Sequence, residues 1–432
     1  PTALAILLAG PQVWVPSLTS ATVSLVLLVA LAVLTGTQAG RRRGAFFLLA
    51  VVPLLYLVSS GTYFVQWYSL LGEVPAFLLL GAATLLAARS VGSAKPLTNA
   101  LAAGLCAGFA INSKLLALVG ALAIGGLFAW QLLRTRSSGA LLSGLVYTAG
   151  LLTPPIVFEL YRYSVLGGEA YVEWLRGMRD FTNTYVPGPA GSAAVRMGNR
   201  IESLLDTTGL SAGLILLPVA TINAWMARRE STDTVFVASV MCLVAGLTYV
   251  IWWLLMSNGW PRYAFIGIGL TVLAAAFALS CVKERRTAAM LVPLMLLAVF
   301  PWRSPSQSVE PIRYALANGF TENERVTSLR AVADFMNNGS GRSSVVMGTW
   351  WAPLAEIEYV SQRPRKTVGY NRLHTAGPDL PGTLLLISPK WDAMAGPEKD
   401  PEYLKMVEVC KTRALVAPPY ELRRCVFAKV DQ

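Results

Sequence analysis

Four residues with chemically useful side chains lie at the ends of long apolar segments of this sequence. Glu73 occurs in QWYSLLGEVPAF, Lys114 in AGFAINSKLLALVGA, and the neighbours Arg262 and Tyr263 in SNGWPRYAFIG. Two cations can pair with the oxygens of a phosphate where water is partly excluded. A carboxylate beside them can orient a hydroxyl group, a sugar or a metal ion. These residue types therefore suit an anionic ligand, provided that the fold brings them together.

The rest of the chain is strongly apolar. Of its 432 residues, 54% are hydrophobic and 14% are charged, with a mean hydropathy of +0.53, whereas soluble domains carry roughly a quarter charged residues. The apolar residues form blocks of about 20, the length that a helix needs to cross a hydrocarbon core roughly 30 Å thick. These blocks are apolar on all sides, unlike the alternating strands of a membrane barrel.

This pattern predicts an all-α polytopic membrane domain with about ten transmembrane helices. Their expected centres are residues 17–36, 45–60, 70–88, 97–112, 115–133, 139–161, 208–226, 234–256, 263–281 and 287–302.

Basic residues between the blocks indicate which side of the membrane each loop faces, because Lys and Arg near helix ends stay on the cytoplasmic side. Basic clusters fall in every second loop, near residues 41–43, 89–95, 134–136, 228–229 and 283–286. The long loop 163–206 and everything after Trp302 are therefore predicted to lie outside. The formal charge of +12 does not indicate nucleic acid, because much of it is already explained by these topology signals.

Lys114 and Arg262 depart from this pattern, since both fall at outer turns, and Glu73 is a third lone charge at an outer end of a segment. Taken alone, each of these residues can be explained as a charged side chain that extends to the membrane surface, where its charge costs roughly a few kcal/mol. Their common side and their aromatic neighbours favour a shared site that faces outward, with a lipid-linked polar headgroup as its ligand. Glu73 can be an acid of this site or can stabilise the start of its helix, and the sequence leaves both open.

The start of the chain bears on the topology. The sequence begins at Pro1 without Met, and the charge pattern places that end outside. We therefore expect a first helix and a first outer loop to precede Pro1.

The sequence changes character after residue 302. Charged residues become frequent and apolar runs shorten, which predicts a periplasmic α/β domain over 303–432 after a membrane domain over 1–302. We expect helices in VTSLRAVADFMNN and LAEIEYVSQ, strands in SSVVMGTWW and GTLLLISP, and two last strands around a Pro-Pro turn.

Two of the five cysteines, Cys410 and Cys425, lie in that last pair of strands. In an oxidising compartment they can form a disulfide across the hairpin, or they can remain free thiols. His374 is the only histidine, and the sequence contains no Cys/His spacing of a metal site.

Four longer motifs carry a family resemblance: GEVPAFLLLGAATLLAAR (72–89), ALAAGLCAGFAINSKLLALV (102–119), NGWPRYAFIGIGLTVLAAA (258–276) and TWWAPLAEIEYVSQRP (349–364). Their order along the chain, their spacing and the membrane side that they face resemble those of the GT-C superfamily of polytopic glycosyltransferases. This superfamily includes the dolichyl-phosphate-mannose-protein mannosyltransferases. Ser113-Lys114 resembles the Thr-Lys or Ser-Lys pair at an outer turn of such enzymes. Arg262-Tyr263 resembles their Arg-Tyr pair before a late helix.

The resemblance implies transfer of a hexosyl or pentosyl group from a polyprenyl-phosphate donor to a glycan, lipid or protein acceptor. Lys114 and Arg262 would then bind the donor phosphate, and Tyr263 would shape the pocket. A carboxylate of the first outer loop, expected before Pro1, would be the main base, which leaves Glu73 as a second candidate catalytic acid. Such transfer occurs with or without a divalent metal, so the resemblance names no cofactor.

Two other functions stay open at this point. A transporter or flippase for an anionic lipid-linked substrate also needs cations, although nearer the midplane. A non-catalytic scaffold subunit of a larger complex would need no base. The bias toward Ala, Leu, Gly and Arg indicates a bacterium, so we expect a multi-pass protein of the inner (cytoplasmic) membrane with a periplasmic C-terminal domain.

Overall fold

The computed structural model describes residues 8, 14–58, 72–91, 93–185, 197–198, 200–201, 222, 234–257, 261–281, 324–338, 346–348, 367–369, 384–387, 407–418 and 420–425. The chain divides into two compact units. One comprises Ser17–Ile312, and the other comprises Pro1–Pro16 with Arg313–Gln432.

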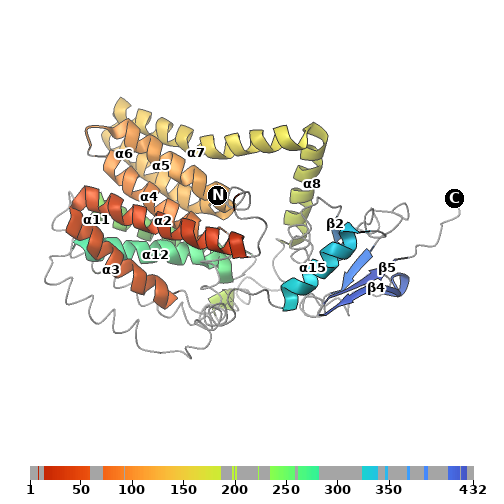
Figure 1. The fold of residues 1–432 in the computed structure, drawn as a ribbon. Helices are drawn as coiled ribbons and strands as arrows, with labels where there is room; N and C mark the ends of the chain where they lie inside the picture. Colours follow the sequence, from red (N-terminus) through yellow and green to blue (C-terminus); the bar gives the residue numbers. More distant parts are fainter. Residues whose placement is uncertain are drawn as a thin grey trace. The chain divides into compact units, whose positions relative to one another are not determined.

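Eight of the ten predicted helical ranges are helices among the described residues (Figure 1). The other two, 208–226 and 287–302, lie outside them. The helices are α2 (Trp14–Ala39), α3 (Arg41–Val58), α4 (Glu73–Ser90), α5 (Pro96–Ser113), α6 (Leu118–Thr135), α7 (Ser138–Leu166), α11 (Thr234–Met256) and α12 (Pro261–Cys281). A short 3₁₀ helix, η2 (Leu115–Ala117), leads into α6.

Six of these helices are long and apolar enough to cross a membrane: Leu18–Gln38, Glu73–Ser90, Leu115–Thr135, Ser138–Leu166, Thr234–Met256 and Tyr263–Cys281. The two others are less uniformly apolar, because α3 begins with three arginines and α5 contains Asn99 and Asn112. The chain is therefore a multi-pass membrane protein. The full number of about ten crossings stays a prediction.

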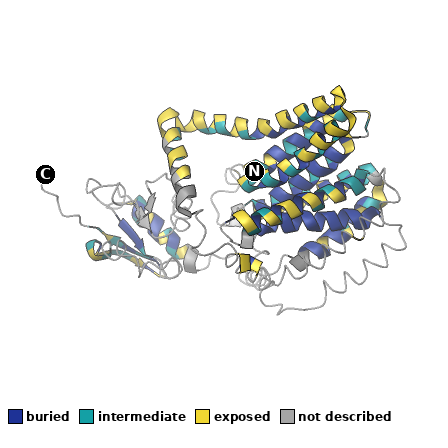
Figure 2. Cartoon of the chain, turned by 180° about the vertical axis from the view of Figure 1, so that it is seen from behind, coloured by how far each residue is buried: buried dark blue, intermediate teal, exposed yellow. Residues whose placement is uncertain are grey.

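The helix α12 forms the centre of the helical unit. All its residues from Ala264 to Cys281 are buried, and Figure 2 shows it dark blue along its length. It packs against α3, α4 and α11. The rings of Phe47 and Phe277 stack at 4.8 Å between centroids, and Ser239 of α11 donates a hydrogen bond of 2.7 Å to the Ala274 carbonyl oxygen. A helix that is apolar on every side can be covered by lipid or by protein, and here neighbouring helices cover it.

Glycine allows α5 and α7 to approach each other closely. A Cβ atom at Gly104 would lie 2.2 Å from the carbonyl oxygen of Tyr147, and one at Gly108 would lie 2.5 Å from that of Leu151. Small residues at such crossings are typical of helix pairs in membranes, where close packing replaces the hydrophobic effect as the main attraction.

The predicted outer loop 163–206 begins with helix rather than loop. α7 is 29 residues long and ends at Leu166, and α8 (Gly168–Tyr185) follows after Gly167. Figure 1 shows α7 continuing beyond the other helices of the unit before the chain turns into α8. The turn is held by the Tyr171 hydroxyl, which donates a hydrogen bond of 3.0 Å to Glu159, and by Arg162, which lies over the ring of Trp174.

The second unit contains a five-stranded sheet in the order β2-β1-β3-β5-β4. β1 (Val346–Gly348) pairs in parallel with β2 (Thr367–Gly369) and β3 (Leu384–Ile387). β5 (Tyr420–Arg424) pairs antiparallel with β3 and with β4 (Thr412–Ala417). The predicted helix near residues 326–338 is confirmed as α15 (Glu324–Asn337), whose buried Leu329, Val332 and Met336 pack with Leu384 and Leu422 of the sheet.

Two further predictions for this part fall on residues that the structure does not describe. They are the helix in LAEIEYVSQ and the boundary between residues 302 and 303.

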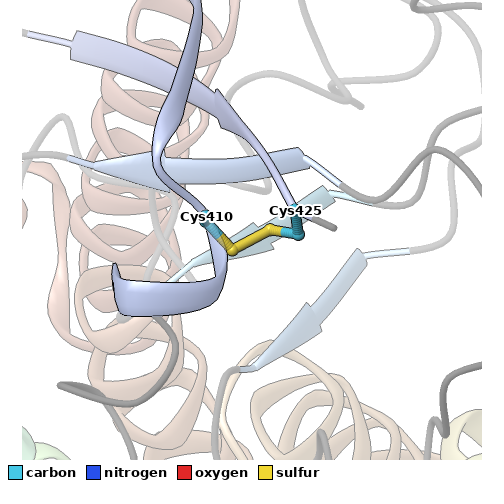
Figure 3. The surroundings of a disulfide bond; sticks show 2 residues. All are labelled: Cys410 and Cys425. Carbon is cyan, nitrogen blue, oxygen red and sulfur yellow. A yellow bond between two sulfur atoms is a disulfide. The ribbon is translucent and has the colours of Figure 1, made fainter. Parts of the chain in front are cut away.

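A disulfide joins Cys410 and Cys425 across the last hairpin (Figure 3). The two cysteines lie just before β4 and just after β5, so the bond closes the open end of the two strands. Of the two alternatives left by the sequence, the structure contains the bonded one.

The disulfide is testable by thiol labelling of the denatured protein. Without reductant, we expect Cys106, Cys242 and Cys281 to react with maleimide and the other two cysteines to stay unmodified. After reduction, all five should react. Mass spectrometry of tryptic peptides gives the sites, and modification of Cys410 and Cys425 before reduction would contradict the bond.

Candidate functional site

The start of α4 touches the end of α5 through one glycine. Gly72 has φ 82°, and a Cβ atom there would lie 2.1 Å from the carbonyl oxygen of Ser113. Glycine alone tolerates both the left-handed backbone and this close approach. The contact puts Glu73, the first residue of α4, beside Lys114, which follows the last residue of α5.

Glu73 and Lys114 form an ion pair, with 2.7 Å between Oε1 of the carboxylate and Nζ of the ammonium. The Glu73 side chain is fully buried, whereas 18% of the Lys114 side chain is exposed. Their helix ends favour these charges, because the amino end of α4 carries partial positive charge and the carboxyl end of α5 partial negative charge. Removing one partner of a buried pair typically costs about 3–5 kcal/mol, because the other charge is left uncompensated.

The role of Glu73 in its own helix is electrostatic only. The residue before the helix is Gly72, which has no side chain to cap it. Within the part of the chain that the structure describes, the Glu73 oxygens accept no hydrogen bond from the backbone, and the Lys114 ammonium is the one charged group against them. The capping role predicted for Glu73 is thus limited to its charge.

Tyr263 joins this ion pair from a third helix. It lies in the first turn of α12, and the Lys114 ammonium lies 5.2 Å from the centre of its ring. An ammonium at that distance from an aromatic face is attracted by the electrons of the ring. Arg262 precedes Tyr263 in the same turn, and its side chain lies outside the described residues. The fold thus brings together three of the four predicted residues.

Sequence analysis missed Tyr249, which lies in α11 and is fully buried. A Cβ atom at Gly267 of α12, one helical turn after Tyr263, would lie 3.1 Å from the ring of Tyr249, so this ring packs beside the start of α12. Among the described atoms this hydroxyl has no hydrogen-bond partner. In the sequence Tyr249 stands within the aromatic and apolar run YVIWW, where nothing separates it from residues that simply span the membrane.

Arg200, also missed, stabilises the neighbouring end of α11. Its buried guanidinium donates hydrogen bonds to the carbonyl oxygens of Trp253 at 3.4 Å, of Leu254 and of Ser257. The last carbonyls of a helix have no partner within the helix, and a buried arginine can satisfy several of them. Arg200 thereby fixes the end of α11 just before the turn that leads to Arg262 and Tyr263. No spacing or motif in the sequence marks it.

Among the described residues this cluster combines a buried carboxylate, the ammonium of a lysine whose side chain is 18% exposed, and a tyrosine ring. The described residues contain no group of three His, Cys, Asp or Glu side chains that could hold a metal ion.

The helical unit is that of a polytopic membrane protein. The chain is similar over 98% of its length to two solved structures of ArnT from Cupriavidus metallidurans, and it spans 86% of those chains. The TM-score is 0.56 at 14% identity to ArnT bound to undecaprenyl phosphate, and 0.53 at 13% identity to ArnT in the apo state. No family model and no curated protein sequence matches the chain. The resemblance to GT-C enzymes is thus confirmed as a resemblance of fold.

The contact between Gly72 and Ser113 predicts a large effect of Gly72→Ala. The positive φ alone should cost about 1–3 kcal/mol, and the clash of the new Cβ with backbone should add to this. We expect a clear fall in the thermal unfolding midpoint of the purified protein in detergent. Gly126→Ala is the matched control, because Gly126 lies within α6 and a Cβ there would meet nothing within 4 Å. Equal midpoints for the two variants would contradict the proposed contact.

Proposed function

We propose that the chain is a membrane glycosyltransferase that uses a polyprenyl-phosphate-linked sugar, and that Lys114 binds the donor phosphate. The observation that carries the proposal is the ammonium of Lys114, whose side chain is 18% exposed and which is held at the ends of three helices beside Tyr263. It is supported by the likeness of the whole fold to ArnT, one structure of which contains undecaprenyl phosphate.

In this proposal the cations act on the leaving group. The bond between the anomeric carbon of the sugar and a phosphate oxygen breaks, and that carbon forms a new bond to the hydroxyl oxygen of the acceptor. The acceptor proton passes to a carboxylate acting as general base. Negative charge grows on the departing polyprenyl phosphate, where a fixed ammonium stabilises it. Arg262, in the first turn of α12, would supply a second cation, and Tyr263 would bound the pocket.

The same proposal covers the location of the site. We place the protein in the bacterial inner membrane with about ten crossings and with its C-terminal α/β unit in the periplasm. The Cys410–Cys425 disulfide supports this side, because disulfides persist in oxidising compartments and are rare in the cytosol. The sugar, hexosyl or pentosyl, is donated there to a glycan, lipid or protein acceptor.

Binding of undecaprenyl phosphate to the purified protein tests the role of Lys114. A hydrogen bond to a charged group is worth about 1.5–3 kcal/mol, so Lys114→Ala should weaken binding by about 10- to 100-fold. Arg262→Ala should also weaken it. Lys95→Ala is the matched control, because Lys95 is an exposed lysine that adjoins the opposite end of α5, and its loss should leave the affinity unchanged. Native mass spectrometry in detergent measures all four proteins.

The outcomes separate the enzyme from the two other functions that the sequence left open. Weakened binding together with transfer of radiolabelled sugar from a polyprenyl-phosphate donor supports the enzyme. Binding that depends on Lys114 with no transfer to any acceptor class would favour a scaffold or a flippase. Unchanged binding in Lys114→Ala would remove the phosphate from this site.

A further inference from the structure

We infer that Glu73 is a positioning residue, which holds the Lys114 ammonium in the place where it meets the phosphate. This inference rests on the proposed function. It differs from both roles that the sequence suggested for Glu73, a catalytic acid and a helix cap.

The two side chains of the ion pair differ in burial. The side chain of Glu73 has no exposed surface and that of Lys114 is 18% exposed, so the accessible part of the pair belongs to Lys114. An ammonium carries three N–H donors, and the contact of 2.7 Å with Oε1 occupies one direction in space. The ring of Tyr263 bounds a second direction. These two contacts restrict where the ammonium can lie.

A lysine needs such support to be selective. Its ammonium is a point charge on a flexible stem of four carbons, so an unsupported lysine loses much conformational freedom when it meets a ligand. Glu73 is itself immobile, because it starts α4 and its neighbour Gly72 is packed against the Ser113 carbonyl oxygen. Because the ion pair holds the ammonium against Glu73, the Lys114 side chain is already restricted before a ligand binds.

The same geometry argues against Glu73 as the general base. A base must come within about 2.6–3.2 Å of the hydroxyl whose proton it takes, or reach it through one water. Both oxygens of Glu73 are buried, and the nearer one faces the ammonium. A substrate hydroxyl would have to displace Lys114 to reach it.

The test is a double-mutant cycle on the affinity for undecaprenyl phosphate, with Glu73→Gln and Lys114→Ala singly and combined. Gln has the shape of Glu without its charge. Loss of a negative charge near a phosphate should by itself strengthen binding, so a positioning role predicts the opposite sign. We expect Glu73→Gln to weaken binding about tenfold, and to have no further effect once Lys114 is Ala. Glu159→Gln, which alters the acid of another ion pair, should leave the affinity unchanged.

A second variant guards against loss of folding. Glu73→Asp keeps the charge and retracts the carboxylate by one methylene, so it should fold as well as the wild type and lose only part of the affinity. Unfolding midpoints in detergent are measured for every variant.

The two proposals fail in different ways. If Lys114→Ala binds as well as the wild type, the phosphate site itself is lost. If Lys114→Ala weakens binding while Glu73→Gln or Glu73→Asp leaves it unchanged or strengthens it, the positioning role is overturned and the phosphate site stands. Equal weakening by Glu73→Gln in the Lys114→Ala background would also overturn it, because Glu73 would then act by another route.

Discussion

A buried carboxylate among membrane helices requires a cation, and this requirement organises the candidate site. Desolvation of Glu73 is tolerable because the Lys114 ammonium lies 2.7 Å away and because the amino end of α4 points at it. The pair needs the two helix ends in contact, which only a glycine at position 72 allows. The backbone contact between Gly72 and Ser113 thus determines the position of the Lys114 ammonium.

The ends of α11 and α12 lie near this ion pair and help to fix its surroundings. α12 is buried from Ala264 to Cys281 and packs against α4 and α11, which fixes the helix whose first turn contains Arg262 and Tyr263. Arg200 closes the preceding end of α11. These features hold rigid helices around a site whose functional groups lie at their termini, as pre-organised binding requires.

Likeness of fold and identity of residues give different information here. A chain that is 14% identical to ArnT keeps its fold, because apolar length and close helix packing can be met by many sequences. Function depends instead on a few charged side chains and on their geometry. Phosphate binding is therefore proposed from the geometry of Lys114, Glu73 and Tyr263, and variants of these residues test it.

The sequence by itself determined the helices, because a span needs a long apolar block, and it located four ionisable or aromatic residues at the ends of those blocks. It also indicated α15, the strands β1, β3, β4 and β5 and the two cysteines of the disulfide, but it missed β2. Only the tertiary structure decided that Glu73 faces Lys114, that Tyr249 packs beside α12 and that Arg200 closes α11. The reason is physical: periodicity reports which side of an element is apolar, whereas the partner of a buried charge depends on which helix ends meet in space.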